Sequence, residues 1–362
     1  MTLTDISSGR RSHTLNEILS QPDCWRECLR QLPSTEEFAK ACKLANSAAE
    51  CILIGCGSSY YLAMAAAASF NHLRLRARAV PASEIFLYPE QYISKERPCV
   101  PVLISRSGIT SEVVNAARFL QKESKIPAIA ITCADRSPLE SLVNATLKLT
   151  AADEKSMVMT RSFTSMLLGL QYLAATVANN GKFRDALLQL PGKVSPLVDT
   201  IPTPFEQFVR SCTCSDFVFL AQGPLFGIAN EAMLKTTEAS RSYTQVFHSM
   251  EFRHGPKSIA GPETLIAFFI SESSYDAEVE VLLEMQKLGS PIIAVANALD
   301  ARARNAADFV IELGLEAPEY ARPAAYTIWG QLMGVYTGMK KGLNPDAPTN
   351  LSRAVVLDGD QA

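Results

Sequence analysis

The chain has 362 residues, which is enough for two domains with separate hydrophobic cores. Hydrophobic residues make up 48 % of it and charged residues 20 %, and 34 basic against 37 acidic residues give a net charge of −3. This balance argues against nucleic-acid binding, which depends on clustered Lys and Arg, and no apolar run reaches the roughly 20 residues that cross a bilayer.

The pattern of apolar residues predicts alternating helices and strands. Steps of three and four residues indicate helices within residues 13–48. Short apolar runs predict strands near residues 51–54, 78–81, 100–104, 128–132, 146–150, 217–220, 265–270, 292–296 and 309–312. Further helices are expected from residue 60 onwards and over residues 111–124, 163–179, 228–240, 277–288 and 323–340. This alternation is typical of parallel sheets that are covered by helices on both faces.

The sequence also repeats itself. Residues 51–70 overlay residues 217–236 without a gap, and the same shift carries residues 102–113 onto 268–279. One architectural unit therefore occurs twice. We predict an α/β fold of two flavodoxin-like, doubly wound parallel sheets in tandem, related by a pseudo-twofold axis. Between the repeats, residues 189–205 are rich in proline, which predicts an extended linker.

Hydroxyl-bearing residues cluster where two strands of the first repeat end. Residues 105–110, SRSGIT, lie between an apolar strand and a helix, and residues 57–59 follow the strand at 51–54. Ligands of open α/β sheets bind at the carboxyl ends of strands, and a helix N-terminus there favours an anion. One Ser or Thr would be an ordinary helix cap, but four or five around these turns favour a bound phosphate.

Other phosphate-binding motifs fit poorly. Tyr60 stands where G-x-G-x-x-G needs its third glycine, and no G-x-x-x-x-G-K-S/T occurs, so a nucleotide cofactor is disfavoured. In the second repeat, Glu272 and Asp276 replace Arg106 and Thr110. Carboxylates beside a helix N-terminus repel a phosphate, so we expect one phosphate site per chain, in the first repeat.

The second repeat carries charged residues that the first repeat lacks. Glu231, Lys235 and Glu238 lie at i, i+4 and i+7 of a predicted helix. His254 follows sixteen residues after Glu238, directly before a Gly-Pro turn. A carboxylate and an imidazole near a sugar phosphate are suited to proton transfer beside a carbonyl. The alternatives are a solvated ion-pair ladder along the helix and a structural histidine.

These motifs resemble those of the sugar isomerase (SIS) domain family. The resemblance is closest to tandem enzymes akin to the isomerase half of glucosamine-6-phosphate synthase and to agaS-type aminosugar-6-phosphate deaminase/isomerases. It covers nearly the whole chain and rests on residues 17–22, 56–59, 105–110, 159–164, 231–238, 254–256 and 346–351.

The resemblance implies an active site without a metal or another cofactor. Glu238 would be the base that moves a proton between C1 and C2 of the sugar, and Lys235 would lie near the reacting carbons. His254 would open the sugar ring from the neighbouring subunit of a homodimer, with the active sites at the interface. The residues implied in substrate binding are Gly57, Ser58, Ser59, Ser105, Arg106, Ser107, Gly108, Thr110, Met159, Thr160 and Arg353.

The chain departs from the family pattern at three points. It starts with Met1 shortly before the SIS part, so we expect no transfer of nitrogen from glutamine. Arg353 replaces a tail lysine that can form an imine in the synthase, and a guanidinium, which stays protonated, excludes that imine. Met159 and Arg106 replace a serine and a glutamine, which leaves the sugar specificity open.

The sequence thus predicts a phosphosugar aldose–ketose isomerase that acts on a hexose 6-phosphate. The specific expectation is an aminohexose-6-phosphate deaminase/isomerase that works through an enediol or enolamine. A fructosamine-6-phosphate deglycase and a non-catalytic phosphosugar-binding regulator are the alternatives. The expected parts are an N-terminal helical segment (1–35), a phosphate-binding SIS domain (36–190), an SIS domain with the acid–base residues (205–345) and a tail that folds over the active site (346–362).

The amino terminus and the cysteines suggest a location. The first residues, MTLTDISSGRR, lack the apolar core of a secretory signal, so we expect a cytoplasmic protein without a membrane or nucleic-acid partner. Nine cysteines lie mostly in apolar runs and are expected as reduced core residues. Cys24 with Cys28 and Cys212 with Cys214 are closely spaced, but neither pair has the companions that a zinc site needs.

Overall fold

The computed structural model describes residues 12–94 and 98–357. Among these, residues 21–154, 159–191 and 352–357 form one compact unit, the first unit, and residues 12–20, 155–158 and 192–351 form the second unit. The expected N-terminal segment and tail extend into residues 1–11 and 358–362, which lie outside the described residues. Within the described residues, no helix combines the length and the apolar composition that crossing a membrane requires.

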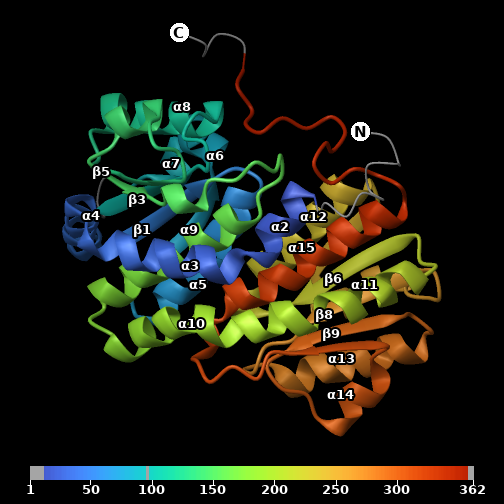
Figure 1. Ribbon diagram of the computed structural model, residues 1–362. Helices are drawn as coiled ribbons and strands as arrows, with labels where there is room; N and C mark the ends of the chain where they lie inside the picture. The colour runs from blue at the N-terminus through green and yellow to red at the C-terminus, as the bar shows by residue number, and fades with distance from the viewer. Residues whose placement is uncertain (1–11, 95–97, 358–362) are drawn as a thin grey trace. The chain divides into compact units, whose positions relative to one another are not determined.

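The first unit contains a five-stranded parallel sheet in the order β2-β1-β3-β4-β5. Its strands are β1 (Glu50–Gly55), β2 (Ala77–Pro81), β3 (Cys99–Ile104), β4 (Ile129–Thr132) and β5 (Ala145–Lys148). Its helices are α3 (Gln21–Gln31), α4 (Glu36–Ser47), α5 (Ser58–His72), α6 (Ala82–Leu87), α7 (Pro89–Tyr92), α8 (Ser111–Phe119) and α9 (Arg161–Val177). Because α5 packs against α9 and α6 packs against α8, helices cover both faces of the sheet (Figure 1).

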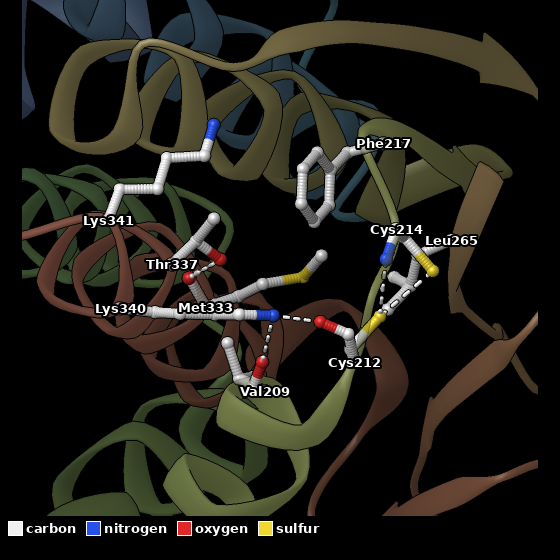
Figure 2. Close-up of a pocket in the computed structure, with 9 residues that line it drawn as sticks. All are labelled: Val209, Cys212, Cys214, Phe217, Leu265, Met333, Thr337, Lys340 and Lys341. Carbon is white, nitrogen blue, oxygen red and sulfur yellow. Dashed lines mark hydrogen bonds between the residues drawn. The ribbon is translucent and has the colours of Figure 1, made fainter. Parts of the chain in front are cut away.

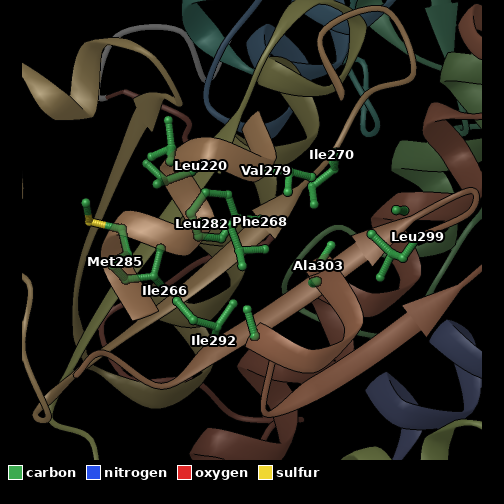
Figure 3. Packing of buried hydrophobic residues seen from close by; sticks show 14 of the residues in the cluster. Leu220, Ile266, Phe268, Ile270, Val279, Leu282, Met285, Ile292, Leu299 and Ala303 are labelled. Atoms are coloured by element: carbon green, nitrogen blue, oxygen red, sulfur yellow. The ribbon is translucent and has the colours of Figure 1, made fainter. Parts of the chain in front are cut away.

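The second unit repeats this arrangement with the order β7-β6-β8-β9-β10. Its strands are β6 (Asp216–Ala221), β7 (Tyr243–His248), β8 (Thr264–Phe269), β9 (Ile292–Ala296) and β10 (Phe309–Glu312). Its helices are α2 (His13–Leu19), α11 (Pro202–Ser211), α12 (Phe226–Ser240), α13 (Tyr275–Lys287), α14 (Ala301–Ala306) and α15 (Pro323–Lys340). Leu220, Ile266 and Phe268 of the sheet pack with Leu282 and Met285 of α13 in a fully buried core (Figure 3).

The predicted fold class is confirmed, because both units are doubly wound parallel sheets with the same strand order. β1 and β6 have bounds that agree with the sequence repeat to the residue. The pairing of the next strand differs by one residue, because Cys51 lies opposite Val100 whereas Phe217 lies opposite Leu265. The repeat therefore preserves the topology and the chain direction, while the strand register has shifted slightly.

The predicted extended linker at residues 189–205 is wrong. This region is helical: α10 (Gly181–Thr200) leads directly towards α11. Pro202 lies at the first position of α11, where a helix needs no N–H donor. Pro191 and Pro196 lie inside α10, and a proline there costs about 3 kcal/mol. Burial of apolar side chains contributes about 1.5–3 kcal/mol each and offsets this cost. The fully buried side chains of α10 include Phe183, Leu187, Leu190 and Val194.

Helices α12 and α15 lie unusually close together because α15 presents glycines to α12. Gly330, Gly334 and Gly338 recur every four residues and so share one side of α15. A Cβ atom at Gly334 would lie 2.6 Å from the carbonyl oxygen of Lys235 on α12. Only glycine fits at that distance without a shift of the backbone, so the stripe fixes α12, and the charged residues on it, against α15.

We predict that Gly334→Ala lowers the free energy of unfolding by about 1–3 kcal/mol, because the added methyl group overpacks the helix contact. Chemical denaturation followed by circular dichroism measures this change. Gly192→Ala is the matched control, because Gly192 is an exposed helical glycine whose Cβ would meet no atom within 4 Å. Its substitution should leave stability unchanged or raise it by up to about 1 kcal/mol. Equal stability of the two variants would contradict the packing argument.

Candidate active site

The first unit places two loops at the carboxyl ends of β1 and β3, the point where the strand order reverses. Such a switch point is where ligands bind in open α/β sheets. Gly57 lies directly before α5 with φ +51°, and Gly108 lies before α8 with φ +66°, a backbone region that favours glycine. A Cβ atom at Gly108 would also collide with the side chain of Ser137. Both loops therefore need glycine, as the predicted phosphate-binding turns require.

The loop of residues 105–110, called the phosphate loop here, is held by its own hydroxyls. Ser105 Oγ accepts a hydrogen bond from the Gly108 N–H at 3.0 Å and lies 3.2 Å from Thr110 Oγ1. Ser107 is partly exposed, and its hydroxyl accepts from the Ile109 N–H at 3.4 Å. The Ser107 N–H makes no hydrogen bond to any residue in the described part of the chain. This amide and hydroxyl are thus open to a ligand at the start of α8.

The equivalent loop of the second unit already holds an anion. Ser271 Oγ accepts from the Ser274 N–H at 3.3 Å, which matches the contact between Ser105 and Gly108 in the first unit. Here, however, Glu319 Oε1 accepts from the N–H groups of Glu272 and Ser273 at 2.7 and 3.3 Å. Glu319 Oε2 accepts from the Ser273 hydroxyl at 2.5 Å. A carboxylate of the chain therefore occupies the donors that correspond to those around Ser107.

Glu272 and Asp276 were expected to repel a phosphate, but both carboxylates lie beside cations. Glu272 forms an ion pair with the buried Arg322, and Asp276 lies 2.9 Å from an amino group of Arg302, so cations accompany both charges. Occupation of the loop by Glu319 is the stronger obstacle to a phosphate. This contact could not be predicted from local sequence, because Glu319 lies 46 residues from Ser273 in the chain.

Glu278 completes the second loop from inside the unit. Its carboxylate accepts from the Ser271 N–H at 3.1 Å and from the hydroxyls of Ser274 and Ser249, both at 2.7 Å. Burial raises the pKa of Glu278, and these three donors oppose that rise. Two carboxylates of the chain, Glu278 and Glu319, therefore accept the hydrogen bonds that the second loop donates.

Arg106, a predicted phosphate ligand, forms an ion pair with a carboxylate of the chain. Its guanidinium lies 3.0 Å from Glu154 Oε1, and both side chains are buried. Glu154 Oε2 also accepts from the N–H and hydroxyl of Thr160 at 3.0 and 2.7 Å and from the Ser162 N–H at 3.2 Å. Arg106 and Glu154 thus join the phosphate loop to the start of α9. Sequence reasoning missed Glu154, and a role for Arg106 in binding stays a prediction.

The tail runs along the phosphate loop within the first unit. The Arg353 carbonyl accepts from the Arg106 guanidinium, and the Arg353 side chain pairs with the exposed Asp153. The Ser111 N–H donates to the Val355 carbonyl at 3.1 Å, and the Leu357 N–H donates to Ser111 Oγ at 2.9 Å. Residues 353–357 therefore border the first turn of α8 and cover part of its N-terminus.

The remaining substrate-binding candidates lie on α5 and before α9. Ser58 and Ser59 are buried in the first turn of α5, directly after Gly57. Ser59 Oγ lies 3.9 Å from the sulfur of Met159. The structure thus brings Ser59 together with Met159, and Arg106 together with Thr160 and Arg353, all within the first unit.

The acid–base candidates of α12 form a buried cluster in the second unit. Glu231 and Lys235 are almost completely buried, whereas the side chain of Glu238 is 17 % exposed. Lys235 Nζ donates to the Glu238 carboxylate and lies 3.5 Å from Glu231 Oε1. Burial excludes the alternative of a solvated ion-pair ladder. Glu238 is the member of the cluster that solvent or a ligand can reach.

His254 occupies a different environment. It ends the short 3-10 turn of residues 251–253, is exposed, and donates its backbone N–H to the Glu251 carbonyl at 3.0 Å. Its ring makes no hydrogen bond or ion pair to any described residue, which includes Lys235 and Glu238. Gly255 follows with φ +112°, and the His254 side chain before this turn is exposed.

Comparison with known proteins shows which family and which relatives this chain is similar to. The model of the SIS domain matches residues 43–176, a segment that contains all five strands of the first unit. The isomerizing glutamine–fructose-6-phosphate aminotransferase of Chlamydia abortus is 25 % identical over 99 % of this chain, which spans only 61 % of that relative's length. A protein of Streptomyces coelicolor named for D-galactosamine-6-phosphate deaminase, AgaS, is 26 % identical, with 93 % of this chain and 91 % of the relative covered.

A solved structure extends the likeness to both units. The crystal structure of glucosamine-6-phosphate deaminase from Thermotoga maritima superimposes with a TM-score of 0.77 and 26 % sequence identity. The match covers 96 % of this chain and 100 % of the other. Each of these proteins has a name that refers to a hexose or aminohexose 6-phosphate.

We predict that Ser107→Ala weakens binding of glucitol 6-phosphate about 10- to 100-fold, because a hydrogen bond to a charged group contributes about 1.5–3 kcal/mol. Isothermal titration calorimetry measures the dissociation constant. Ser273→Ala removes the equivalent hydroxyl from the loop that Glu319 occupies, and it should leave the affinity unchanged. Weaker binding in the Ser273 variant alone would contradict the assignment of the phosphate to the first unit.

Proposed function

We propose that this chain, which belongs to the SIS domain family, is an aminohexose-6-phosphate deaminase/isomerase. Relatives named for deamination of galactosamine 6-phosphate and glucosamine 6-phosphate cover nearly all of the chain, which supports this class of substrate. In the reaction, an aminohexose 6-phosphate and water give a ketohexose 6-phosphate and ammonia.

The difference between the two loops carries this proposal. The Ser107 amide and hydroxyl are open, whereas the matching groups of Ser273 bind Glu319. A phosphate dianion is the ligand that such donors suit, because it offers several acceptor oxygens and favours the positive end of α8. Glycine at position 108 allows the phosphate to approach the backbone. The 6-phosphate would thus anchor the sugar at the phosphate loop.

Glu238 is suited to the proton transfer. Once the ring is open, C1 is an aldehyde and C2 carries the amino group. A base removes the C2 proton to form an enolamine, and return of the proton to C1 gives an imine at C2, which water hydrolyses to the ketose and ammonia. Glu238 is the partly exposed carboxylate of the α12 cluster, and the Lys235 ammonium beside it can stabilise negative charge that develops on the sugar oxygen.

His254 is proposed to assist ring opening. An imidazole that is exposed and engaged with no described residue is available for proton exchange with a sugar hydroxyl. The homodimer, with His254 acting on the partner subunit's substrate, is part of the same proposal. Ring opening would be slowed in His254→Gln, while the open-chain substrate would still react.

The decisive experiment supplies galactosamine and glucosamine 6-phosphate and measures ammonia and ketose phosphate. Glu238→Gln should lower kcat about 10²- to 10⁴-fold, the usual contribution of a general base, and should leave the affinity for glucitol 6-phosphate intact. Glu206→Gln is the matched control, because Glu206 also pairs with a cation of its own helix but is not part of the proposed site. It should retain full activity.

Two results would contradict this function. Unchanged kcat in Glu238→Gln would remove that carboxylate from the mechanism. Tight binding of hexose 6-phosphates without turnover of any of them would identify a phosphosugar-binding regulator instead.

A further inference from the structure

Cys212 and Cys214 lie outside the residues that the proposed function uses. Cys212 follows the last turn of α11, and Cys214 comes shortly before β6. Both line a small pocket in the second unit, together with Met333 and Lys340 of α15 (Figure 2). The connection between α11 and β6 therefore carries two half-buried thiols on one side.

The two sulfur atoms are close enough to react. Cys212 Sγ lies 2.9 Å from Cys214 Sγ, so an approach of about 0.9 Å would reach the length of a disulfide bond. The Cys214 N–H points at Cys212 Sγ from 3.5 Å, and Lys340 Nζ donates to the Cys212 carbonyl. A thiol, an amide N–H and an ammonium thus surround Cys212, and each favours a thiolate there.

The charges at this pocket distinguish the two cysteines. The hydrogen bond between the two thiols, with help from the Cys214 N–H and Lys340, lowers the pKa of Cys212 to about 6, although burial and Asp308 act the other way. The same bond raises the pKa of Cys214 well above its usual range. Cys212 Sγ accepts from the Cys214 N–H, whereas the Cys214 thiol also donates to the Pro262 carbonyl at 3.8 Å. This geometry favours Cys212 as the thiolate nucleophile and Cys214 as the thiol that keeps its proton until a second step.

Other cysteines lack this combination. Burial raises the pKa of Cys42 and Cys56 to about 11 and that of Cys51 to about 12. Cys24 and Cys28 also interact, and the pKa of Cys24 is lowered, but both side chains are buried between α3 and its neighbours. The dithiol also lacks metal ligands, because the described residues contain no group of three or more His, Cys, Asp or Glu that could hold a metal ion.

We propose that Cys212 and Cys214 are a redox-active dithiol that a low-molecular-weight disulfide of the glutathione type converts into an intrachain disulfide. The Cys212 thiolate attacks one sulfur of the small disulfide and releases the other as a thiolate. Cys214 then loses its proton to solvent and attacks the Cys212 sulfur, which expels the second small thiolate. The chain loses two electrons and two protons, and the small disulfide is reduced to two thiols.

The new bond would tie the end of α11 to the segment that enters β6. The Lys340 ammonium at the end of α15 donates to the carbonyl of Cys212, which is one of the two bonded residues. The disulfide would therefore also alter this contact of α15. The site responds to oxidant independently of whether the phosphate loop binds a sugar phosphate.

The test treats the folded chain with oxidised glutathione, alkylates the remaining thiols and digests with trypsin without reduction. Residues 211–235 form one peptide that contains Cys212 and Cys214 and no other cysteine. We expect this peptide to lose both alkylatable thiols and two hydrogen atoms. Cys24 and Cys28, the buried pair, serve as the internal control and should remain fully alkylatable after unfolding.

Two single variants test the order of the steps. Cys214→Ser should accumulate a glutathione adduct on Cys212, because the resolving thiol is absent, whereas Cys212→Ser should form little adduct on Cys214. The proposal is overturned if residues 211–235 keep two free thiols at oxidant levels that modify Cys24 or Cys28. It is also overturned if the adduct forms on Cys214 in preference to Cys212.

Discussion

Backbone N–H groups at the end of a central strand need acceptors, and the two units of this chain meet that need differently. In the second unit, Glu319 accepts from the amides of Glu272 and Ser273 and from the Ser273 hydroxyl. In the first unit, the Ser107 amide has no acceptor in the described part of the chain. The duplicated loop is thus filled by a carboxylate of the chain in one copy, whereas in the other copy the Ser107 amide has no acceptor among the described residues. Assignment of the phosphate to one unit depends on this single difference.

The proposed acid–base residues depend on a packing constraint. α12 can carry a buried cluster of two carboxylates and one ammonium because α15 approaches it along a stripe of glycines. Buried ion pairs contribute little to stability, since the cost of removing charges from water offsets their attraction. The buried pair of Lys235 and Glu238 is therefore weak evidence for a stabilising role, and it is consistent with the proposed role in proton transfer. The first repeat has Ala65 and Ser69 at the positions equivalent to Glu231 and Lys235, so it contains no such cluster.

The sequence predicted those features that follow from local pattern. Buried strands such as β1 and β6 are short apolar runs, and the repeat related them to the residue. β7 was missed because its residues, YTQVFH, form a half-exposed edge strand without an apolar run. α10 was mistaken for a linker because its two prolines outweighed its apolar periodicity in the prediction. The hydroxyls of residues 105–110 predicted a phosphate-binding loop from the local sequence, whereas the contacts of Arg106 with Glu154 and with the tail were not predicted.

Contacts between distant residues account for what the sequence did not reveal about the site. Arg106 was predicted to bind a phosphate. In the structure its guanidinium donates to the carboxylate of Glu154, which lies 48 residues further on. The contact between Glu319 and Ser273 is equally remote in sequence. No local spacing encodes such pairs, and only the fold brings them together. Side-chain charge alone therefore did not reveal the partners of Arg106 and Ser273.

A crystal structure of the chain with glucitol 6-phosphate tests the central claim most directly. We expect the phosphate within hydrogen-bond distance of the Ser107 amide and hydroxyl, with Glu319 still bound to the loop of the second unit. A phosphate that displaced Glu319 and bound Ser273, with the loop around Ser107 empty, would contradict the assignment of roles to the two repeats.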